Sequence, residues 1–196
     1  MLDNYYNERQ PNVERIFQAP AIMRYAERVM IYALVLGLEP ERVLEIGTAH
    51  GGTAWIIVQA MDDVGRGQLV CVDPSPTWTP EMTQDIGHRA TLVTGASPDA
   101  LKSCALLAGG SFDLVLIDGD HSYDAVRADV EGVLPYVSGR GRLVFHDWHH
   151  PPVWEAIQTS LAWHTNLFDA GRLTVAEIPY LGQSQGGLYS VVKGRD

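Results

Sequence analysis

Short apolar runs alternate with amphipathic segments along most of the chain. The apolar runs, rich in Val, Ile and Leu as buried strands are, lie at 43–46, 69–72, 91–93, 114–117 and 143–145. Between and after them, apolar residues recur at helical spacing over 53–61, 80–88, 98–107, 123–134 and 153–163. Such alternation is typical of a parallel sheet with helices on both faces and right-handed crossovers. We therefore predict a doubly wound α/β fold.

The two ends of the chain depart from this rhythm. Residues 1–19 are polar with scattered aromatics and predict an arm or short helix, whereas 20–36 predict a helix that starts at Pro20 and stops at Gly37. Near the other end, apolar runs at 173–178 and 188–192 flank the glycine- and glutamine-rich segment 182–187. This pattern predicts a closing hairpin that adds antiparallel strands to the sheet.

No repeat, linker or low-complexity tract divides the chain, so we expect a single domain over residues 1–196. Its parts would be an N-terminal arm and helix at 1–38 and an α/β core at 40–196.

Composition narrows the classes of partner. The 196 residues include 14 Lys and Arg against 24 Asp and Glu, a formal net charge of −10. Binding to nucleic acid or to an anionic membrane needs clustered basic residues, and no such cluster occurs. No signal-peptide pattern opens the chain, and no apolar stretch reaches the roughly 18–20 residues that span a bilayer. We expect a cytoplasmic protein that acts on a small molecule, with Cys71 and Cys104 buried and unpaired.

Candidate chemistry follows the predicted strands, because ligands of open α/β sheets bind beyond the carboxyl ends of the strands. A glycine-rich turn, residues 47–52, follows the first strand and permits close backbone approach. The second strand ends at Asp73, which either binds the two hydroxyls of a ribose or caps a turn. After the third strand, small residues leave room for an adenine ring, although Ser97 could equally cap a helix, as could Thr53 after the first turn. Together these features favour an adenosyl cofactor.

The fourth and fifth strands end in acids and histidines, namely Asp118, Asp120, His121, His146 and Asp147. Neighbouring strand ends lie about 5 Å apart, so these groups should converge. Crowded carboxylates repel unless a cation or a proton intervenes. A divalent cation, Mg²⁺ by default and Mn²⁺ as an alternative, would satisfy them. The other interpretation is that they are loop caps and cofactor-pocket acids with no metal.

The motif Glu45-Ile46-Gly47-x-x-x-Gly51, with Asp73 and the stretch 117–123, resembles the class I S-adenosylmethionine-dependent methyltransferases. More narrowly, it is similar to the metal-dependent O-methyltransferases of the catechol and caffeoyl-CoA type, the macrocin-type sugar methyltransferases and their cephalosporin-hydroxylase-like relatives. The resemblance covers about residues 40–150, implies a seven-stranded Rossmann-like sheet, and names S-adenosylmethionine as cofactor. The cofactor positions that it implies are Glu45, Gly47, Thr48, Gly51, Asp73, Ala96, Ser97, Asp118 and Asp120.

In this resemblance Glu45 orients the glycine loop and Asp120 lies beside the methionine amino group. The resemblance also implies a metal held by Asp118, His146 and Asp147. His146 departs from the pattern, because the related enzymes carry an acid there. Either Asp147 takes a ligand position with His146 beside it, or the metal is softer, or none binds.

His121 stands where related enzymes carry a Lys or His base, although it could instead cap the following helix. Several other aromatic residues allow two interpretations each. His149 and His150 belong either to a lid or to an exposed loop, and Trp78 either lines a ligand site or anchors the core. Tyr5, Tyr6 and Phe17 would form a flap over the cleft or a contact in a homo-oligomer.

The function that best fits is metal-assisted O-methylation of a small hydroxylated molecule. A metal-independent N- or O-methyltransferase is the first alternative. A nicotinamide-dependent oxidoreductase is disfavoured because the glycine turn lacks the G-x-G-x-x-G spacing. A non-catalytic adenosyl-binding protein is disfavoured by the many acids and histidines at the strand ends.

Overall fold

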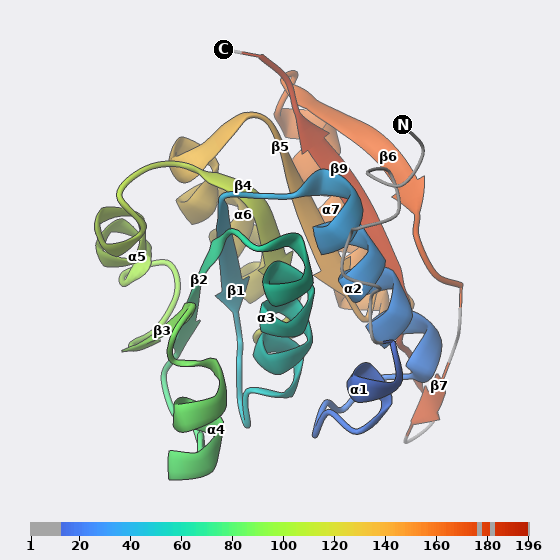
Figure 1. Cartoon of the computed structure of the whole chain (residues 1–196). Helices are drawn as coiled ribbons and strands as arrows, with labels where there is room; N and C mark the ends of the chain where they lie inside the picture. The colour runs from blue at the N-terminus through green and yellow to red at the C-terminus, as the bar shows by residue number, and fades with distance from the viewer. Residues whose placement is uncertain (1–12, 176–177, 181–182, 196) are drawn as a thin grey trace, which may run out of the picture.

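The computed structural model describes residues 13–175, 178–180 and 183–195. Its centre is a seven-stranded sheet in the order β3-β2-β1-β4-β5-β9-β6 (Figure 1). The first five strands run parallel, and β9 runs antiparallel to both β5 and β6. The predicted fold, a mostly parallel sheet closed by antiparallel strands, is confirmed. The strands are β1 (Arg42–Ile46), β2 (Gln68–Asp73), β3 (Ala90–Thr94), β4 (Phe112–Ile117), β5 (Val137–His146), β6 (Leu167–Arg172) and β9 (Leu188–Lys193).

Helices cover both faces of the sheet. In Figure 1, α2 (Tyr25–Leu38) and α3 (Gly52–Val64) lie in front of it, and α6 (Tyr123–Val133) and α7 (Pro151–Trp163) lie behind it. Each face has its own apolar cluster, and successive strand residues alternate between them: Val43 belongs to one and Leu44 to the other. This explains why the central strands read as continuous apolar runs. The remaining helices are α1 (Glu14–Phe17), α4 (Pro80–Ile86), α5 (Leu101–Ala108) and the short 3₁₀ helix η1 (Leu134–Tyr136).

The predicted bounds of the first long helix are wrong at both ends. Helix α2 begins at Tyr25 and not at Pro20, and it ends at Leu38 with Gly37 inside its last turn. The residue that ends it is Glu39, which adopts a left-handed conformation at φ 45°. Before Tyr25 the backbone carbonyls point to the side chain of Arg28 instead of to helical N–H groups, so Pro20 lies in a loop.

The closing hairpin is also built differently from the prediction. Residues 173–175 of the strand expected at 173–178 are not strand, residues 176–177 lie outside the described residues, and Ile178 begins β7. The partner of β9 is the earlier β6, whose side chains are mostly exposed and whose apolar signal is therefore weak. Gly171, at φ 85°, follows a register shift in this edge strand. The backbone of the intervening segment forms a separate small hairpin of β7 (Ile178–Tyr180) and β8 (Gln183–Gln185).

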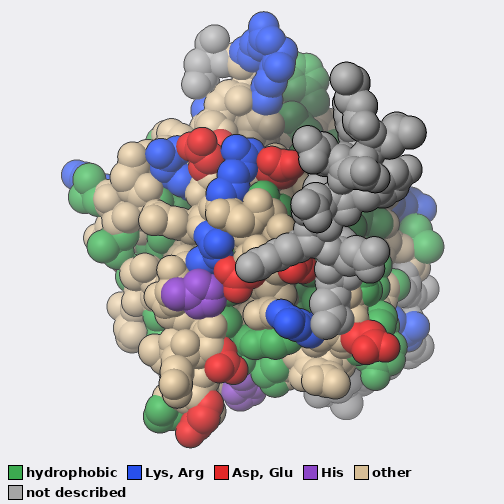
Figure 2. Space-filling model, viewed as in Figure 1, with side chains coloured by type: hydrophobic (Ala, Val, Ile, Leu, Met, Phe, Trp, Pro, Cys, Tyr) green, Lys and Arg blue, Asp and Glu red, His purple; other side chains and the backbone are tan. Residues whose placement is uncertain are grey.

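Both cysteines are buried and free, as predicted. Among the described residues, no helix is long and apolar enough to cross a membrane. On the described part of the face in Figure 2, Lys and Arg side chains are interspersed with Asp and Glu and form no continuous basic stripe.

Candidate active site

Two cavities open at the carboxyl ends of the parallel strands, and the loops that follow the neighbouring strands β1 and β4 contribute to both. They share Gly47, Ala49 and Asp118 in their walls. The glycine-loop cavity, about 470 Å³, is lined by residues that include Gly47, Asp73, Ala96, Ser97, Asp118 and Asp120. The histidine cavity, about 270 Å³, is lined by residues that include Thr48, His50, Asp118, His121, His146 and Asp147. Asp118 therefore lies where a ligand in one cavity would meet a ligand in the other.

Gly47 brings the β1 and β4 loops into contact. Its φ is 86°, and an added Cβ would lie 2.2 Å from the carbonyl oxygen of Asp118. No other residue type fits this combination of backbone angle and close approach. The sheet's topological switch point lies here, which is where ligands of this fold class bind.

Asp73 fixes the glycine loop from the neighbouring strand. Its Oδ2 accepts hydrogen bonds from the backbone N–H groups of Thr48 and Ala49 at 3.1 and 2.9 Å. Its Oδ1 accepts one from the N–H of Ser75 at 2.7 Å. Asp73 thus caps two turns and also lines the glycine-loop cavity. Its position is compatible with both the capping and the ribose-binding interpretation.

Gly51 and Trp78 pack against one another beside the loop. Gly51 precedes α3 at φ 82°, and an added Cβ would lie 2.9 Å from Trp78 Nε1. Trp78 packs against the apolar cluster of the front face and donates to Thr48 Oγ1 at 3.3 Å. Gly51 makes room for Trp78 and lines neither cavity.

Neither residue expected as a helix cap plays that role. Helix α3 begins at Gly52, one residue before Thr53, which is buried in the wall of the histidine cavity. Helix α5 begins at Leu101, four residues beyond Ser97, which lines the glycine-loop cavity. Ser97 is thus free of the cap and available to a ligand.

Asp129 is a cavity residue that sequence reasoning missed, because it looks like one more acid on the polar face of α6. It is 4% exposed and lines the glycine-loop cavity. Burial raises its pKa to about 6, with the Ser97 hydroxyl beside it acting in the opposite direction. Asp129 thus places a buried hydrogen-bond acceptor beside Ser97 in the wall of this cavity.

Two more acids support the glycine-loop cavity. The Oδ1 of Asp120 accepts from the N–H of Ser122 at 2.7 Å, which lowers its pKa. Glu45, in the middle of the sheet, is fully buried, and burial raises its pKa to about 7 despite the nearby Thr48 hydroxyl. Glu45 lies under the glycine loop and reaches neither cavity wall.

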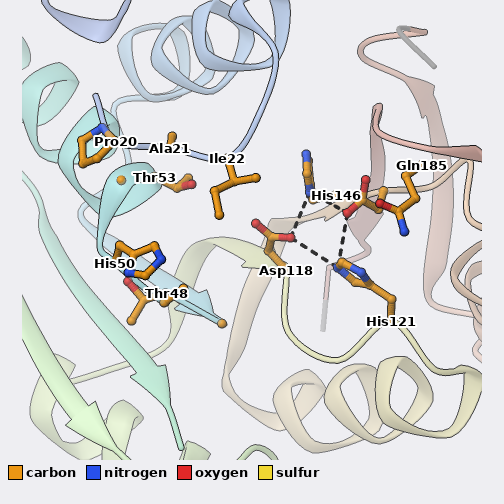
Figure 3. Close-up of a pocket in the computed structure, with 14 residues that line it drawn as sticks. Pro20, Ala21, Ile22, Thr48, His50, Thr53, Asp118, His121, His146 and Gln185 are labelled. Carbon is orange, nitrogen blue, oxygen red and sulfur yellow. Dashed lines mark hydrogen bonds and ion pairs between the residues drawn. The ribbon is translucent and has the colours of Figure 1, made fainter. Parts of the chain in front are cut away.

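Four side chains in the histidine cavity point toward one another (Figure 3): Asp118, His121, His146 and Asp147. His146 Nδ1 lies 2.9 Å from Asp118 Oδ1 and 3.2 Å from Asp147 Oδ2. His121 Nε2 lies 3.5 and 3.4 Å from the same two oxygens. The predicted convergence is therefore present in the structure. The helix cap after this loop is Ser122, which accepts from the N–H of Ala125, so the capping interpretation of His121 is wrong.

The electrostatics of the cluster are strongly coupled. Burial opposes the charge of Asp118, but the imidazoles of His146 and His121 lower its pKa to about 2. Burial likewise opposes a proton on His146, yet the carboxylates raise its pKa well above the ordinary value. The hydrogen bond to Asp118 raises the pKa of His121, with burial opposing it. The carboxylates and the imidazoles thus stabilise one another's charged forms.

Glu27, from the start of α2, reaches the far side of this cluster, and no sequence pattern near it signals such a role. It is fully buried, and its Oε2 lies 3.5 Å from His146 Nε2. The same carboxylate accepts from the N–H of Gly187 at 2.6 Å and of Arg24 at 2.7 Å. Asp147, held at φ 54°, accepts from the N–H of Gly186 in the same loop. The N-terminal helix and the loop before β9 are thus joined at the site.

The outer wall of the histidine cavity is the loop Pro20–Ile22, which faces the cluster in Figure 3. Arg28 holds this loop, because its buried guanidinium donates hydrogen bonds to five backbone carbonyls. The acceptors are the carbonyl oxygens of Ile16, Phe17, Ala19, Ala21 and Met23. Gln185 completes the wall from β8. None of these wall residues was predicted, since in the sequence they lie far from the residues that end the parallel strands.

The remaining aromatic residues take defined positions. His149 stacks on buried Trp148 at 3.9 Å between ring centroids, and the His150 ring lies 6.2 Å from that of His121. Both histidines are half-buried, which fits neither a fully exposed loop nor a core position. Phe17 is 42% exposed and packs edge-on against Tyr25, whereas Tyr5 and Tyr6 lie outside the described residues.

The donor set of the cluster fits a divalent cation. Asp118, His121, His146 and Asp147 each offer one ligand atom, and these atoms lie within 4.8 Å of one another. Carboxylate oxygens and imidazole nitrogens are the usual protein ligands of such ions.

The comparison with protein families agrees with this geometry. Residues 44–148, more than half of the chain, match the family described as a methyltransferase domain. The chain belongs to the methyltransferase domain family. The matched residues run from β1 to the loop after β5, and they contain the glycine loop, Asp73 and the whole cluster.

A curated relative is the uncharacterized protein y4gI of Sinorhizobium fredii (strain NBRC 101917 / NGR234). It is 31% identical over 134 residues, which are 58% of this chain and 14% of the relative. The chain therefore spans about a seventh of the length of that protein.

Solved structures share the fold. An O-methyltransferase from Bacillus cereus in complex with SAH has a TM-score of 0.68 at 17% identity, covering 98% of this chain and 95% of that one. TomG from Streptomyces achromogenes, an O-methyltransferase of tomaymycin synthesis in complex with SAM, has a TM-score of 0.64 at 16% identity, covering 98% and 94%. MycE, in complex with Mg, SAH and mycinamycin VI, has a TM-score of 0.63 at 21% identity, covering 96% and 56%. The prediction of the class I methyltransferase fold and family is confirmed.

Proposed function

We propose that this methyltransferase transfers a methyl group from S-adenosylmethionine to a hydroxyl of a small molecule, with the help of a divalent cation. The observation that carries the proposal is the wall shared by the two cavities. Gly47 and Asp118 border both, so a sulfonium in the glycine-loop cavity would face an acceptor in the histidine cavity. The O-methyltransferase activity named for the Bacillus cereus protein and for TomG, and the Mg named in the MycE complex, support this choice.

The glycine-loop cavity would take the cofactor in an extended pose. Its walls offer Gly47 and Asp118 to the methionine part, Asp73 to the ribose, and Ala96 with Ser97 to the adenine. Asp120 would accept from the methionine ammonium group. Asp129 would accept a hydrogen bond from the adenine amino group, because it is the buried acid beside Ser97.

The histidine cavity would hold the acceptor and the cation. Asp118, His146 and Asp147 are the proposed ligands, since the His146 Nδ1 lies within 3.2 Å of both carboxylates. When bound, a divalent cation there would neutralise the carboxylates and lower the pKa of an acceptor hydroxyl.

His121 is the proposed base. Its side chain is 32% exposed in the cavity wall, and its Nε2 faces the same carboxylate oxygens. The acceptor oxygen attacks the methyl carbon in line, the carbon–sulfur bond breaks with its electron pair moving to sulfur, and His121 takes the hydroxyl proton. S-adenosylhomocysteine and a methyl ether are the products.

Turnover and binding measurements test the proposal. Calorimetry should show that the protein binds S-adenosylmethionine and S-adenosylhomocysteine but not NAD. Methyl transfer from labelled cofactor to a library of phenols and sugars should be abolished by EDTA and restored by a divalent cation. Full activity in EDTA would favour the metal-independent alternative, and binding without transfer to any acceptor would favour the non-catalytic one.

His121→Gln separates the base from the ligands. We expect turnover at pH 7 to fall about 10²–10⁴-fold, as for the loss of a general base, while metal binding and cofactor affinity stay close to those of the wild type. His164→Gln, on the far end of α7, is the matched histidine control and should behave as the wild type. Loss of metal binding in His121→Gln would assign His121 to the ligands.

A further inference from the structure

His146 gives the cluster a donor that sets it apart from an all-oxygen cation site. The last side chain of β5 is the imidazole of His146, whose Nδ1 faces the carboxylates of Asp118 and Asp147. Mg²⁺ prefers oxygen ligands and keeps several of its waters, whereas Mn²⁺, Fe²⁺, Co²⁺ and Zn²⁺ accept imidazole nitrogen readily. The donor types alone therefore bear on which ion the site takes.

The spacing of the donors supports coordination by His146 itself. The Nδ1 lies 2.9 and 3.2 Å from the two carboxylate oxygens. Neighbouring ligands that bind one ion at about 2.1 Å in an octahedral arrangement are roughly 3 Å apart. The imidazole nitrogen thus has the spacing of an adjacent corner of one coordination shell to each of the two carboxylate oxygens. The His146 side chain is only 6% exposed, so its ring cannot swing away into solvent.

Glu27 determines which nitrogen of His146 faces the cluster. Its Oε2 lies 3.5 Å from Nε2, on the opposite side of the ring from the carboxylates. Metal-binding histidines usually have a carboxylate or carbonyl on the second ring nitrogen, which fixes the tautomer and the orientation of the ring. An acid held against Nε2 keeps the proton there and leaves the Nδ1 lone pair for an ion.

Glu27 is itself rigidly held, as a positioning residue must be. It is fully buried, it accepts from the Arg24 N–H at the start of its own helix, and it accepts from the Gly187 N–H across 160 residues of sequence. Its contacts therefore come from the N-terminal helix and from the loop before β9. Neither segment contributes a ligand, and both meet behind the same imidazole.

We infer that this site takes a divalent transition metal in preference to Mg²⁺, through His146 Nδ1, Asp118 and Asp147, and that Glu27 is the positioning residue that aims His146. This inference rests on the part of the proposed function that assigns a cation to the cluster. It specifies the class of ion and adds a residue outside the matched family region.

Metal titration of the full chain, stripped with a chelator and dialysed, tests the ion preference. Co²⁺ should bind at one equivalent, with a visible d–d spectrum typical of a site with a nitrogen ligand, and Zn²⁺ should displace it. Mg²⁺ should bind at least about tenfold more weakly than Mn²⁺ by calorimetry. His146→Glu, which replaces nitrogen by oxygen, should narrow or reverse this preference. Equal affinity of the wild type for Mg²⁺ and Mn²⁺, or an unchanged preference in His146→Glu, would overturn the inference.

Glu27→Gln tests the positioning role with the same readouts. We expect the Co²⁺ affinity to fall about 10–100-fold, as for other residues that orient metal-binding histidines, and the d–d spectrum to shift. Glu39→Gln is the matched control, because Glu39 lies at the other end of α2 and its side chain is 55% exposed. If Glu27→Gln does not fold, Glu27→Asp, which keeps the charge but draws it back from the ring, replaces it. An unchanged Co²⁺ affinity and spectrum in a folded variant would exclude the role.

Binding of S-adenosylhomocysteine to the stripped protein keeps the two proposals apart. If the cofactor product binds and Mg²⁺ is preferred, the inference fails and the proposed methyl transfer stands. If the transition-metal preference is found but no adenosyl ligand binds, the proposed function fails and the metal inference stands.

Discussion

The two cavities of the site are built in contrasting ways. Each wall of the glycine-loop cavity comes from the turn that directly follows a parallel strand, apart from the α6 residues beside it. The histidine cavity instead joins parts of the chain that are far apart, such as the loop Pro20–Ile22 and Gln185. The first cavity follows from the general rule for ligand binding in α/β sheets. The second depends on how the two ends of this chain fold over the sheet, which is where a methyl acceptor would be selected.

Asp118 belongs to both cavities, so its replacement should have the largest effect. Asp118→Asn keeps the size of the side chain but removes the charge that faces His146 and His121. We expect kcat/KM for methyl transfer to fall about 10²–10³-fold, as on removal of a key electrostatic group, with cofactor affinity and metal affinity both reduced. Asp113→Asn on β4, which lines neither cavity, is the control. A loss of only one of the two affinities would show that Asp118 serves a single cavity.

Arg28 affects the histidine cavity alone, which makes it the sharpest test of the contrast. Arg28→Met leaves five backbone carbonyls of the 16–23 segment without their shared donor. We expect the free energy of unfolding to fall by about 3 kcal/mol. At a temperature where the variant is folded, KM for the acceptor should rise while the Kd for S-adenosylhomocysteine stays unchanged.

Arg15→Met, which loses one exposed contact to Gln59, provides the comparison for Arg28. Urea denaturation and acceptor kinetics of the two variants measure the effects. An equal rise in the cofactor Kd would mean that the two cavities are not built independently.

The sequence predicts the glycine-loop half well for a physical reason. Central parallel strands are buried on both faces, so their apolar runs are unmistakable, and Asp73 and Asp118 lie directly at their ends. The edge strand β6 is mostly exposed and carries no such signal, which is why the apolar pattern predicts a strand at 173–178 instead. Apolar periodicity also cannot show that the backbone carbonyls before Tyr25 accept hydrogen bonds from the Arg28 side chain instead of from helical N–H groups. The periodicity therefore predicts that α2 starts at Pro20, whereas it starts at Tyr25.

The cluster of acids and histidines was predictable as a convergence but not as a connected network. Sheet geometry brings Asp118 and His146 together, because they follow neighbouring strands. Nothing in the sequence links Glu27 to Gly187, since this contact joins residues 160 positions apart through a side chain and a loop. The same limit hid Asp129, whose burial depends on how α6 packs over the third strand end.

Glu45 under the glycine loop should make stability depend on pH. Burial raises its pKa from an ordinary value of 4.5 to about 7, so the folded protein holds this proton more tightly than the unfolded chain does. Stability from this group is therefore present below pH 4.5 and is lost as the pH rises to about 7. Glu45→Gln cannot ionise, so its free energy of unfolding lacks this decrease. Between pH 4.5 and pH 8 we expect the stability of the variant to rise by up to roughly 3 kcal/mol relative to that of the wild type. Urea denaturation of both proteins at pH 4.5 and pH 8 measures this change. A difference in free energy of unfolding between variant and wild type that does not depend on pH would contradict the raised pKa of Glu45.

Asp129 should show the smallest effect and one confined to the glycine-loop cavity. Asp129→Ala removes the buried carboxyl beside Ser97, and we expect the Kd for S-adenosylhomocysteine to rise about five- to tenfold, the net contribution of one hydrogen bond. Asp124→Ala, on the exposed side of the same helix, should leave the Kd unchanged. Inosine in place of adenosine in the ligand lacks the amino donor. The inosine ligand should bind the wild type more weakly than the adenosine ligand does. Asp129→Ala should bind the two ligands with equal affinity, because only the wild type has an acceptor for the adenine amino group. If both proteins discriminate equally between the two bases, the adenine lies elsewhere, and the cofactor pose along this cavity must be reversed.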